Sequence, residues 1–189
     1  MTDQDLDGSH IKGLCINMFD CLWPSLLQLD GFLGFMNTPI LKATRNKTTT
    51  AFYNENDYEQ WKSEHNNGDG WKIKYYKGLG TSTGAEFKEY FTNKKIMNLC
   101  VVDNDRENLD MVFNKAKEKA TLRKSWLGKY DRTDTLNLSK VEVTLSDFVN
   151  KEMIHFSKYD CDRSIPNLMD GLKTSQRKIL YSAFKKNLT

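Results

Sequence analysis

Three aspartates stand at alternate positions near the start of the chain, at Asp3, Asp5 and Asp7, and Gly8 closes the group. In an extended segment, alternate side chains point the same way and lie about 6.6 Å apart. Carboxylates at that spacing repel one another unless a cation lies among them, and both Mg²⁺ and Ca²⁺ favour oxygen ligands. The spacing therefore predicts a divalent-metal site, with these three aspartates as its candidate ligands.

Two other interpretations of the acidic group remain open. The pattern also matches the first half of an EF-hand calcium loop, which closes with a glutamate at its twelfth position. Counted from Asp3, that position is Leu14. The second alternative is a solvated acidic turn that binds nothing. A catalytic Mg²⁺ site fits best, because it needs only one or two carboxylates and leaves positions for phosphate oxygens.

The residues after the acidic group predict a helix, so the carboxylates are expected at a strand end just before a helix N-terminus. Ser9 is the candidate N-cap and Pro24 the candidate stop. Phosphates bind at such positions in open α/β sheets. We expect the apolar row of this helix to face the core; its members are Ile11, Leu14, Cys15, Met18 and Leu22.

A glycine-containing loop, Lys77-Gly78-Leu79-Gly80, follows a predicted strand at 71–76. Thr83 and Glu86 form a capping box that predicts a helix directly after the loop. The third glycine of a dinucleotide fingerprint is missing, and so is a Walker sequence. Contact with a phosphodiester and a plain strand-to-helix turn therefore both remain open for this loop.

The rest of the chain alternates predicted strands and helices, which is typical of an α/β fold. Strands are expected at 32–43, interrupted at Pro39, and at 49–53, with a helix at 57–63. A longer helix is expected at 107–126. Its polar side, with Arg123 and Lys124, is compatible with a solvated face or with a binding surface. A polar linker at 129–143 precedes two further helices, at 145–157 and 172–186.

Composition sets limits on the function. The formal net charge of +3 over 189 residues is too small to indicate nucleic-acid binding by itself, although no acid follows Asp170. The 4 cysteines form no C-x-x-C pair and the 3 histidines offer no zinc spacing, so we expect reduced thiols. No apolar run approaches membrane-spanning length, and we expect a soluble protein with no membrane partner.

Four segments together resemble type IIA DNA topoisomerases, and their sequences are most similar to eukaryotic-type topoisomerase II. They are the acidic segment 1–13, Thr38-Pro39-Ile40, the segment 71–83, and the segment 162–173. The resemblance implies an α/β fold: the C-terminal part of a TOPRIM domain at 1–128, with a Rossmann-like parallel sheet and flanking helices. The linker at 129–143 and the mostly helical start of a winged-helix DNA-gate domain at 144–189 would follow.

The resemblance implies part of the cleavage core of an enzyme that passes one duplex through a transient double-strand break, using ATP and Mg²⁺. Two Mg²⁺ ions would act at each active site. By position, Asp3 would ligate both ions, Asp5 the second, and Asp7 would support the pair or ligate through water. Arg123, Lys124 and Lys173 align with residues of the family that contact DNA, and we add Lys77 as a fourth candidate contact with double-stranded DNA.

The resemblance also implies that other parts of the active site lie outside this chain. They are a catalytic glutamate, the reactive arginine-tyrosine pair and the ATP-binding domain, so the chain alone is expected to be inactive. A homodimer and a nuclear location are implied as well. Thr174 and Ser175 replace the family's proline and glycine, and the linker is shorter than usual in eukaryotic members. The alternative to an enzyme is a non-enzymatic module that binds a divalent cation.

Overall fold

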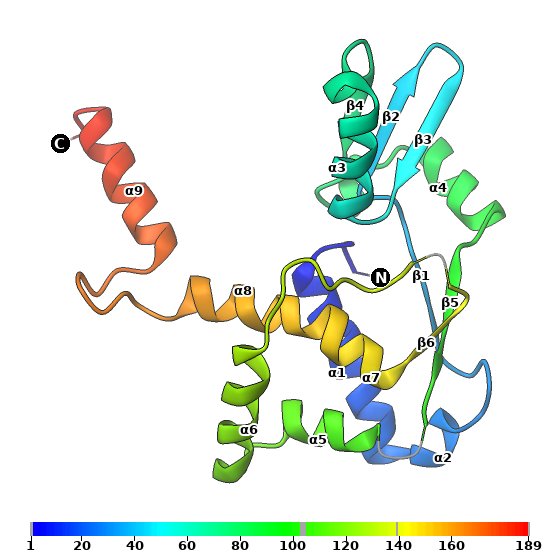
Figure 1. The fold of residues 1–189 in the computed structure, drawn as a ribbon, viewed down its shortest axis with the longest axis vertical. Coiled ribbons are helices and arrows are strands. Elements are labelled where there is room, and N and C mark those ends of the chain that lie inside the picture. The colour runs from blue at the N-terminus through cyan, green and yellow to red at the C-terminus, as the bar shows by residue number, and fades with distance from the viewer. Residues whose placement is uncertain (1, 103–104, 139, 189) are drawn as a thin grey trace.

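The computed structural model describes residues 2–102, 105–138 and 140–188 (Figure 1). The described elements are α1 (Leu6–Leu22), α2 (Pro24–Leu27), β1 (Gly34–Met36), β2 (Leu41–Arg45), β3 (Thr48–Phe52), α3 (Glu55–Glu64), the 3₁₀ turn η1 (Asn66–Gly68), β4 (Lys72–Tyr75), the 3₁₀ turn η2 (Leu79–Thr81), α4 (Gly84–Thr92), β5 (Ile96–Cys100), α5 (Arg106–Phe113), α6 (Lys117–Gly128), β6 (Glu142–Thr144), α7 (Leu145–Phe148), the π-helical turn η3 (Val149–Met153), α8 (Ile154–Ser164) and α9 (Thr174–Lys185). Their alternation confirms the expected α/β class.

The described strands form two small sheets of three strands each. In one sheet, β5 pairs antiparallel with β1 and parallel with β6, with Asn98 opposite Glu142. In the other, β2 pairs antiparallel with both β3 and β4, so that Leu41 lies between Phe52 and Tyr75. Among the described strands, β5 and β6 are paired in parallel and the other three pairings are antiparallel, so the sheets are small and mixed and not the expected Rossmann-like parallel sheet.

The larger core is built by α1, the β1-β5-β6 sheet and the helices α5 to α8. Its most deeply buried side chains are Ile16, Met97, Leu109, Leu145, Phe148, Val149 and Met153. Burying a side chain of the size of Phe148 stabilises a fold by about 1.5–3 kcal/mol. Since these residues come from both sides of position 144, where we expected a domain to begin, the core continues across that position.

The smaller core lies under the β3-β2-β4 sheet, where α3 packs against it. Leu41, Ala43, Phe52 and Tyr58 are buried there, and Trp61 and Trp71 pack around them. The next helix, α4, begins as the sequence predicts: Thr83 Oγ1 accepts from the Glu86 N–H at 3.3 Å, and a Glu86 oxygen accepts from the Thr83 N–H at 2.7 Å. This reciprocal capping positions the loop that precedes it.

The first helix differs from the prediction at its start and in its buried face. Helix α1 begins at Leu6 with Asp5 as its N-cap, earlier than Ser9, which is buried inside the helix. The predicted core row is exposed: its four largest members are 44–59% accessible, namely Ile11, Leu14, Met18 and Leu22, and Cys15 is exposed too. The buried face consists of Gly8, Ser9, Gly13 and Ile16.

The reason for the exchange of faces is a close approach at Gly13. A Cβ atom placed there would lie 2.8 Å from Met153 Sδ and 3.2 Å from Phe113 Cζ. The glycine thus lets α1 pack directly on η3 and α5. Because glycine has no side chain, its role gives no hydrophobic signal in the sequence, and the periodicity of the larger residues indicated the wrong face.

The single helix predicted at 107–126 is two helices, α5 and α6. The chain bends at Asn114, whose side chain accepts from the Ala116 N–H at 2.9 Å and donates to Asp110 at 2.7 Å. Arg123 Nη1 donates to the carbonyl oxygens of Met111 and Asn114 at 2.9 and 2.8 Å. These bonds supply partners for the last carbonyls of α5, which a helix end otherwise leaves without them.

Helix α9 projects from the body beyond α8 (Figure 1), and none of its residues is buried. Its entry is set by Thr174, whose hydroxyl donates to the Asp162 carbonyl of α8 at 3.1 Å. The four cysteines are unpaired, as expected, although Cys15 and Cys21 are exposed. Among the described residues we find no helix with both the length and the apolar character needed to cross a membrane.

Candidate metal centre and nucleic-acid interface

The acidic group lies at the N-terminus of α1, but not as a row along one side of an extended segment. Asp5 caps the helix, and its Oδ1 accepts from the Gly8 N–H at 2.7 Å. Asp7 lies inside the first turn of the helix. A Cβ atom at Gly8 would overlap the carbonyl oxygen of Asp3, so the chain folds back here in a way that requires glycine. The helix dipole favours negative charge at this end.

This geometry rules out the calcium-loop alternative. Counted from Asp3, Leu6 is the fourth residue of such a loop, and the helix already begins there. The loop that would wrap around an ion is therefore helical from its first third onward. Asp3 and Asp5 are instead exposed carboxylates at a helix start, as a site open to phosphate requires.

Asp7 is held by an arginine that lies 156 residues further along the chain. Arg163, in the last turn of α8, donates from Nη1 and Nη2 to the two Asp7 oxygens at 3.0 and 2.6 Å. Hydrogen bonding from Arg163 lowers the pKa of the Asp7 carboxyl, and the bonds to Asp7 and Asp160 raise the pKa of Arg163. The guanidinium carbon also lies 4.8 Å from the Tyr159 ring centre.

A second set of contacts fixes α1 to η3 one turn further along. The Ser9 hydroxyl donates to Glu152 Oε1 at 2.7 Å, and Lys12 forms an ion pair with the same carboxylate. The side chains of Lys12 and Glu152 are only 18% and 15% exposed. The Lys12 ammonium also lies 5.1 Å from the centre of the Phe35 ring. The helix that carries the acidic group is therefore held by charges with little solvent screening.

The glycine-containing loop meets the acidic group. A Cβ atom at Gly78 would have the Asp3 carboxylate as its nearest neighbour, at 2.9 Å from Oδ2 and 3.2 Å from Oδ1. The Gly78 carbonyl oxygen accepts from the Thr81 hydroxyl at 2.8 Å and from the Thr81 N–H at 3.1 Å, which closes the loop. Lys77, the candidate DNA contact, is exposed beside this glycine.

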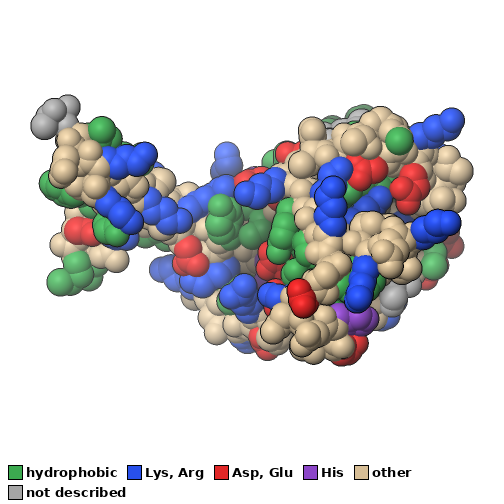
Figure 2. Space-filling view, turned by 90° about the horizontal axis from the view of Figure 1, so that it is seen from above, with side chains coloured by type: hydrophobic (Ala, Val, Ile, Leu, Met, Phe, Trp, Pro, Cys, Tyr) green, Lys and Arg blue, Asp and Glu red, His purple; other side chains and the backbone are tan. Residues whose placement is uncertain are grey.

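The other candidate DNA contacts lie apart from the acidic group. Lys124 is exposed on α6, whereas the adjacent Arg123 is half-buried and bonds to the end of α5. Lys173 is exposed at the start of α9, where its N–H donates to Gln176 at 2.8 Å. Figure 2 shows Lys and Arg side chains on the projecting α9 arm and on the adjoining face of the body.

The three candidate metal ligands, Asp3, Asp5 and Asp7, do not form a single cluster that could hold a metal ion. Within the described ranges, no three His, Cys, Asp or Glu side chains lie close enough together to hold a metal ion. Asp3 and Asp5 nevertheless suit Mg²⁺, which is commonly bound by one or two carboxylates and completed by water and phosphate oxygens. The donor chemistry therefore fits a partial Mg²⁺ site. Sequence reasoning missed Arg163, because only the fold brings it to Asp7.

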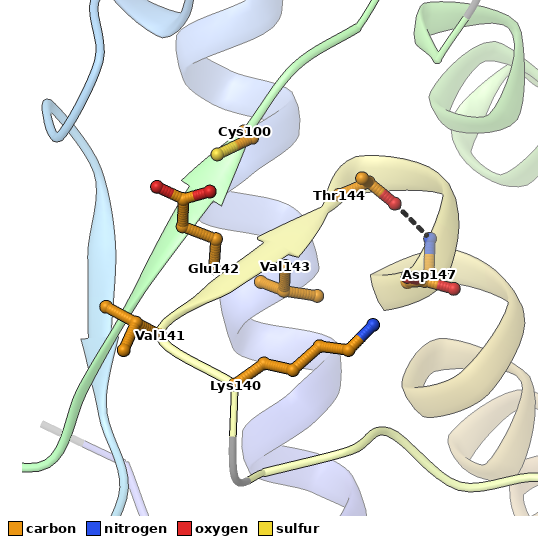
Figure 3. A pocket seen from close by; sticks show the side chains of 7 residues that line it. All are labelled: Cys100, Lys140, Val141, Glu142, Val143, Thr144 and Asp147. Atoms are coloured by element: carbon orange, nitrogen blue, oxygen red, sulfur yellow. Dashed lines mark hydrogen bonds between the residues drawn. The ribbon is translucent and has the colours of Figure 1, made fainter.

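A shallow pocket of about 410 Å³ lies elsewhere, against β6 and the start of α7 (Figure 3). Its lining includes Cys100, Lys140, Glu142 and Asp147, and the Asp147 N–H donates to Thr144 Oγ1 at 3.0 Å. Burial raises the pKa of the Cys100 thiol. Figure 3 shows Lys140 and Glu142 directed away from each other. None of the candidate site residues lines this pocket, so it is not part of the site.

The fold and site define an α/β chain that presents carboxylates at a helix start, next to a basic, glycine-containing loop. The family described as "C-terminal associated domain of TOPRIM" matches residues 36–161. The chain belongs to this family.

Known proteins agree with this assignment over the whole chain. It is 51% identical to "DNA topoisomerase 2" of Plasmodium falciparum, covering 100% of this chain and 13% of that protein. It is 53% identical to "DNA topoisomerase 2" of Arabidopsis thaliana, covering 98% and 13%. A crystal structure of the "Plasmodium falciparum topoisomerase II DNA-binding, cleavage and re-ligation domain" superimposes with a TM-score of 0.86 at 49% identity, covering 100% of this chain and 26% of that one. The resemblance to type II topoisomerases is confirmed, and the chain spans about 13% of the length of these relatives.

Proposed function

We propose that this chain forms part of the DNA-cleavage core of an ATP-dependent type II DNA topoisomerase. One observation carries the proposal: the exposed carboxylates Asp3 and Asp5 stand at a helix start beside the Gly78 loop. The names of the relatives, at about half identity over the full chain, support the reaction class. The nucleophilic tyrosine, its arginine and the ATP site would be supplied by other parts of the polypeptide.

Asp3 and Asp5 would hold Mg²⁺, with two ions at each complete active site. When bound, Mg²⁺ would offset the charge on the phosphate oxygens during cleavage. Asp7 would act as a support, because its two oxygens already bond to Arg163 and the pair holds the first turn of α1 to α8. Asp5 would have two tasks, since the same side chain caps the helix.

Exposed lysines would bind the backbone of double-stranded DNA. Lys77, Lys124 and Lys173 reach solvent from the loop, from α6 and from α9, and phosphate contacts of this kind make affinity depend on salt. Arg123 would contact DNA from a guanidinium that α5 keeps in place. A homodimer would be needed if each subunit cuts one strand, and the nucleus would be the site of action.

The proposal is tested with Asp5→Asn in the full-length protein. Asparagine keeps the oxygen that caps α1, since Asn is as good an N-cap as Asp, but it removes the charge. We expect Mg²⁺-dependent DNA cleavage to fall by about 10- to 100-fold while DNA binding persists. Asp69→Asn, an exposed carboxylate beyond η1, is the matched control and should cleave normally.

Two outcomes would count against the proposal. Normal cleavage by both Asp3→Asn and Asp5→Asn would exclude these carboxylates from the metal centre. Tight cation binding together with no binding or cleavage of DNA by the unmodified full-length protein would favour the alternative, a non-enzymatic cation-binding module.

A further inference from the structure

Gly78 and Asp3 come from segments 75 residues apart and meet at the site. The three atoms nearest to an added Gly78 Cβ all belong to the Asp3 carboxyl group: Oδ2 at 2.9 Å, Cγ at 3.1 Å and Oδ1 at 3.2 Å. The space that a Cβ atom at position 78 would need is therefore bounded by the Asp3 carboxylate. A side chain of any size at position 78 would compete with the carboxylate for this space.

The Gly78 backbone and the Asp3 carboxylate differ in how easily their atoms can shift. The Gly78 carbonyl is held by two hydrogen bonds from Thr81, and the loop lies between β4 and the capped helix α4. The atoms that an added Cβ at position 78 would meet belong to the end of the Asp3 side chain and not to backbone, and the end of a side chain shifts more easily than backbone does. An added methyl group at position 78 would therefore be accommodated mainly by movement of the Asp3 carboxylate, with little effect on the core.

The size of that movement is significant for a metal ligand. The distance from an added Gly78 Cβ to Asp3 Oδ2 is 2.9 Å, and ordinary packing begins at 3.4 Å. Restoring ordinary packing therefore moves the carboxylate by about 0.5 Å. Mg²⁺ demands near-ideal octahedral geometry at about 2.0–2.1 Å, and well-formed metal sites keep ligand distances within about 0.2 Å. A displacement that the fold tolerates easily is thus too large for a metal ligand.

We propose that Gly78 is a positioning residue that sets the location of the Asp3 carboxylate, so that this glycine and the acidic group form one metal-binding unit. This inference rests on the proposed function, because it assigns a partner to the same site. It gives the glycine-containing loop a role separate from phosphate contact, because the absence of a side chain at position 78 determines the position of the Asp3 carboxylate.

The test compares Gly78→Ala with Gly80→Ala in the full-length protein bound to DNA. An added Cβ at Gly80 meets nothing within 4 Å, so this variant changes the same loop without touching the carboxylate. Binding of Mn²⁺ is followed by electron paramagnetic resonance, and the Mg²⁺ concentration for half-maximal cleavage is measured in parallel. We expect both to weaken by about 10-fold in Gly78→Ala and to remain unchanged in Gly80→Ala.

The remaining outcomes are decisive. Mn²⁺ binding by Gly78→Ala at the level of the unmodified protein overturns the inference, and so does an equal loss in Gly80→Ala. Hydrogen exchange of α1 and β4 should change by less than about twofold in Gly78→Ala; a general loss of protection means a structural role and also overturns it. If Asp3→Asn keeps Mn²⁺ binding and cleavage, the proposed function fails at Asp3 and the inference fails with it. If only Gly78→Ala behaves normally, the inference alone fails.

Discussion

The contact between Glu152 and the helix that carries the acidic group leads to a quantitative prediction for Glu152→Gln. Glutamine keeps an oxygen for the Ser9 hydroxyl but removes the anion that faces Lys12, whose side chain is 18% exposed. Hydrogen bonds to charged groups contribute about 1.5–3 kcal/mol, and breaking a fully buried pair costs about 3–5 kcal/mol. Because the side chains of this pair are 15–18% exposed, we expect Glu152→Gln to lower the stability of α1 by about 2 kcal/mol, which lies in the first of these two ranges.

That cost is measurable in the full-length protein by amide hydrogen exchange. A difference of about 2 kcal/mol corresponds to about a 30-fold increase in the opening equilibrium of α1. Lys151→Gln is the matched control, because it breaks an ion pair with Asp147 in the same segment whose members are 37% and 36% exposed. Such exposed pairs contribute about 0.5 kcal/mol or less. Protection of α1 in Glu152→Gln within twofold of the unmodified protein would refute the reasoning.

Two further predictions concern α4 and α6. Burial alone would raise the pKa of Glu86, but hydrogen bonds from Lys74, from Thr83 in the α4 capping box and from Tyr76 outweigh burial and lower its pKa to about 2. The stabilisation that ionised Glu86 contributes is therefore present above about pH 4.5 and is lost as the pH falls toward 2. In hydrogen exchange, Glu86→Gln should destabilise α4 by about 1–2 kcal/mol at pH 7 and by much less at pH 2.5. An equal destabilisation at the two pH values would contradict this assignment of the pKa. Arg123→Ala should increase hydrogen exchange at the α5–α6 junction by about 10-fold, because the Met111 and Asn114 carbonyls lose a donor. Lys124→Ala is the control variant. If exchange in Arg123→Ala is unchanged and equals that in Lys124→Ala, the Arg123 hydrogen bonds contribute nothing to stability.

The elements predicted correctly are those whose signals are local. Thr83 and Glu86 stand three residues apart and cap each other, so the start of α4 could be predicted from the sequence. The strand at 71–76 could also be predicted, since its side chains alternate and glycines precede it. In each case the residues that determine the structure are neighbours in the chain.

The elements predicted wrongly depend on contacts made by the fold. The break after α5 is stabilised by Arg123, and nothing in the periodicity of 107–126 indicates that its side chain bonds to carbonyls of the preceding helix. The buried face of α1 is determined by Gly13, which allows close approach of Met153. The types of the metal-ligand candidates were readable from the sequence, but the pairing of Asp7 with Arg163 was not.

The contacts of α1 also determine when this helix can become stable during synthesis. Its partners Glu152 and Arg163 follow Ser9 and Asp7 by 143 and 156 residues. At a ribosomal rate of about 5–20 residues per second, roughly 7–30 seconds pass between the synthesis of α1 and that of η3. During that interval α1 lacks Met153, one of the two side chains that its glycine face packs against. The first helix of the chain is therefore among the last elements of the larger core to be secured, and the acidic group takes its final geometry only after α8 has been made.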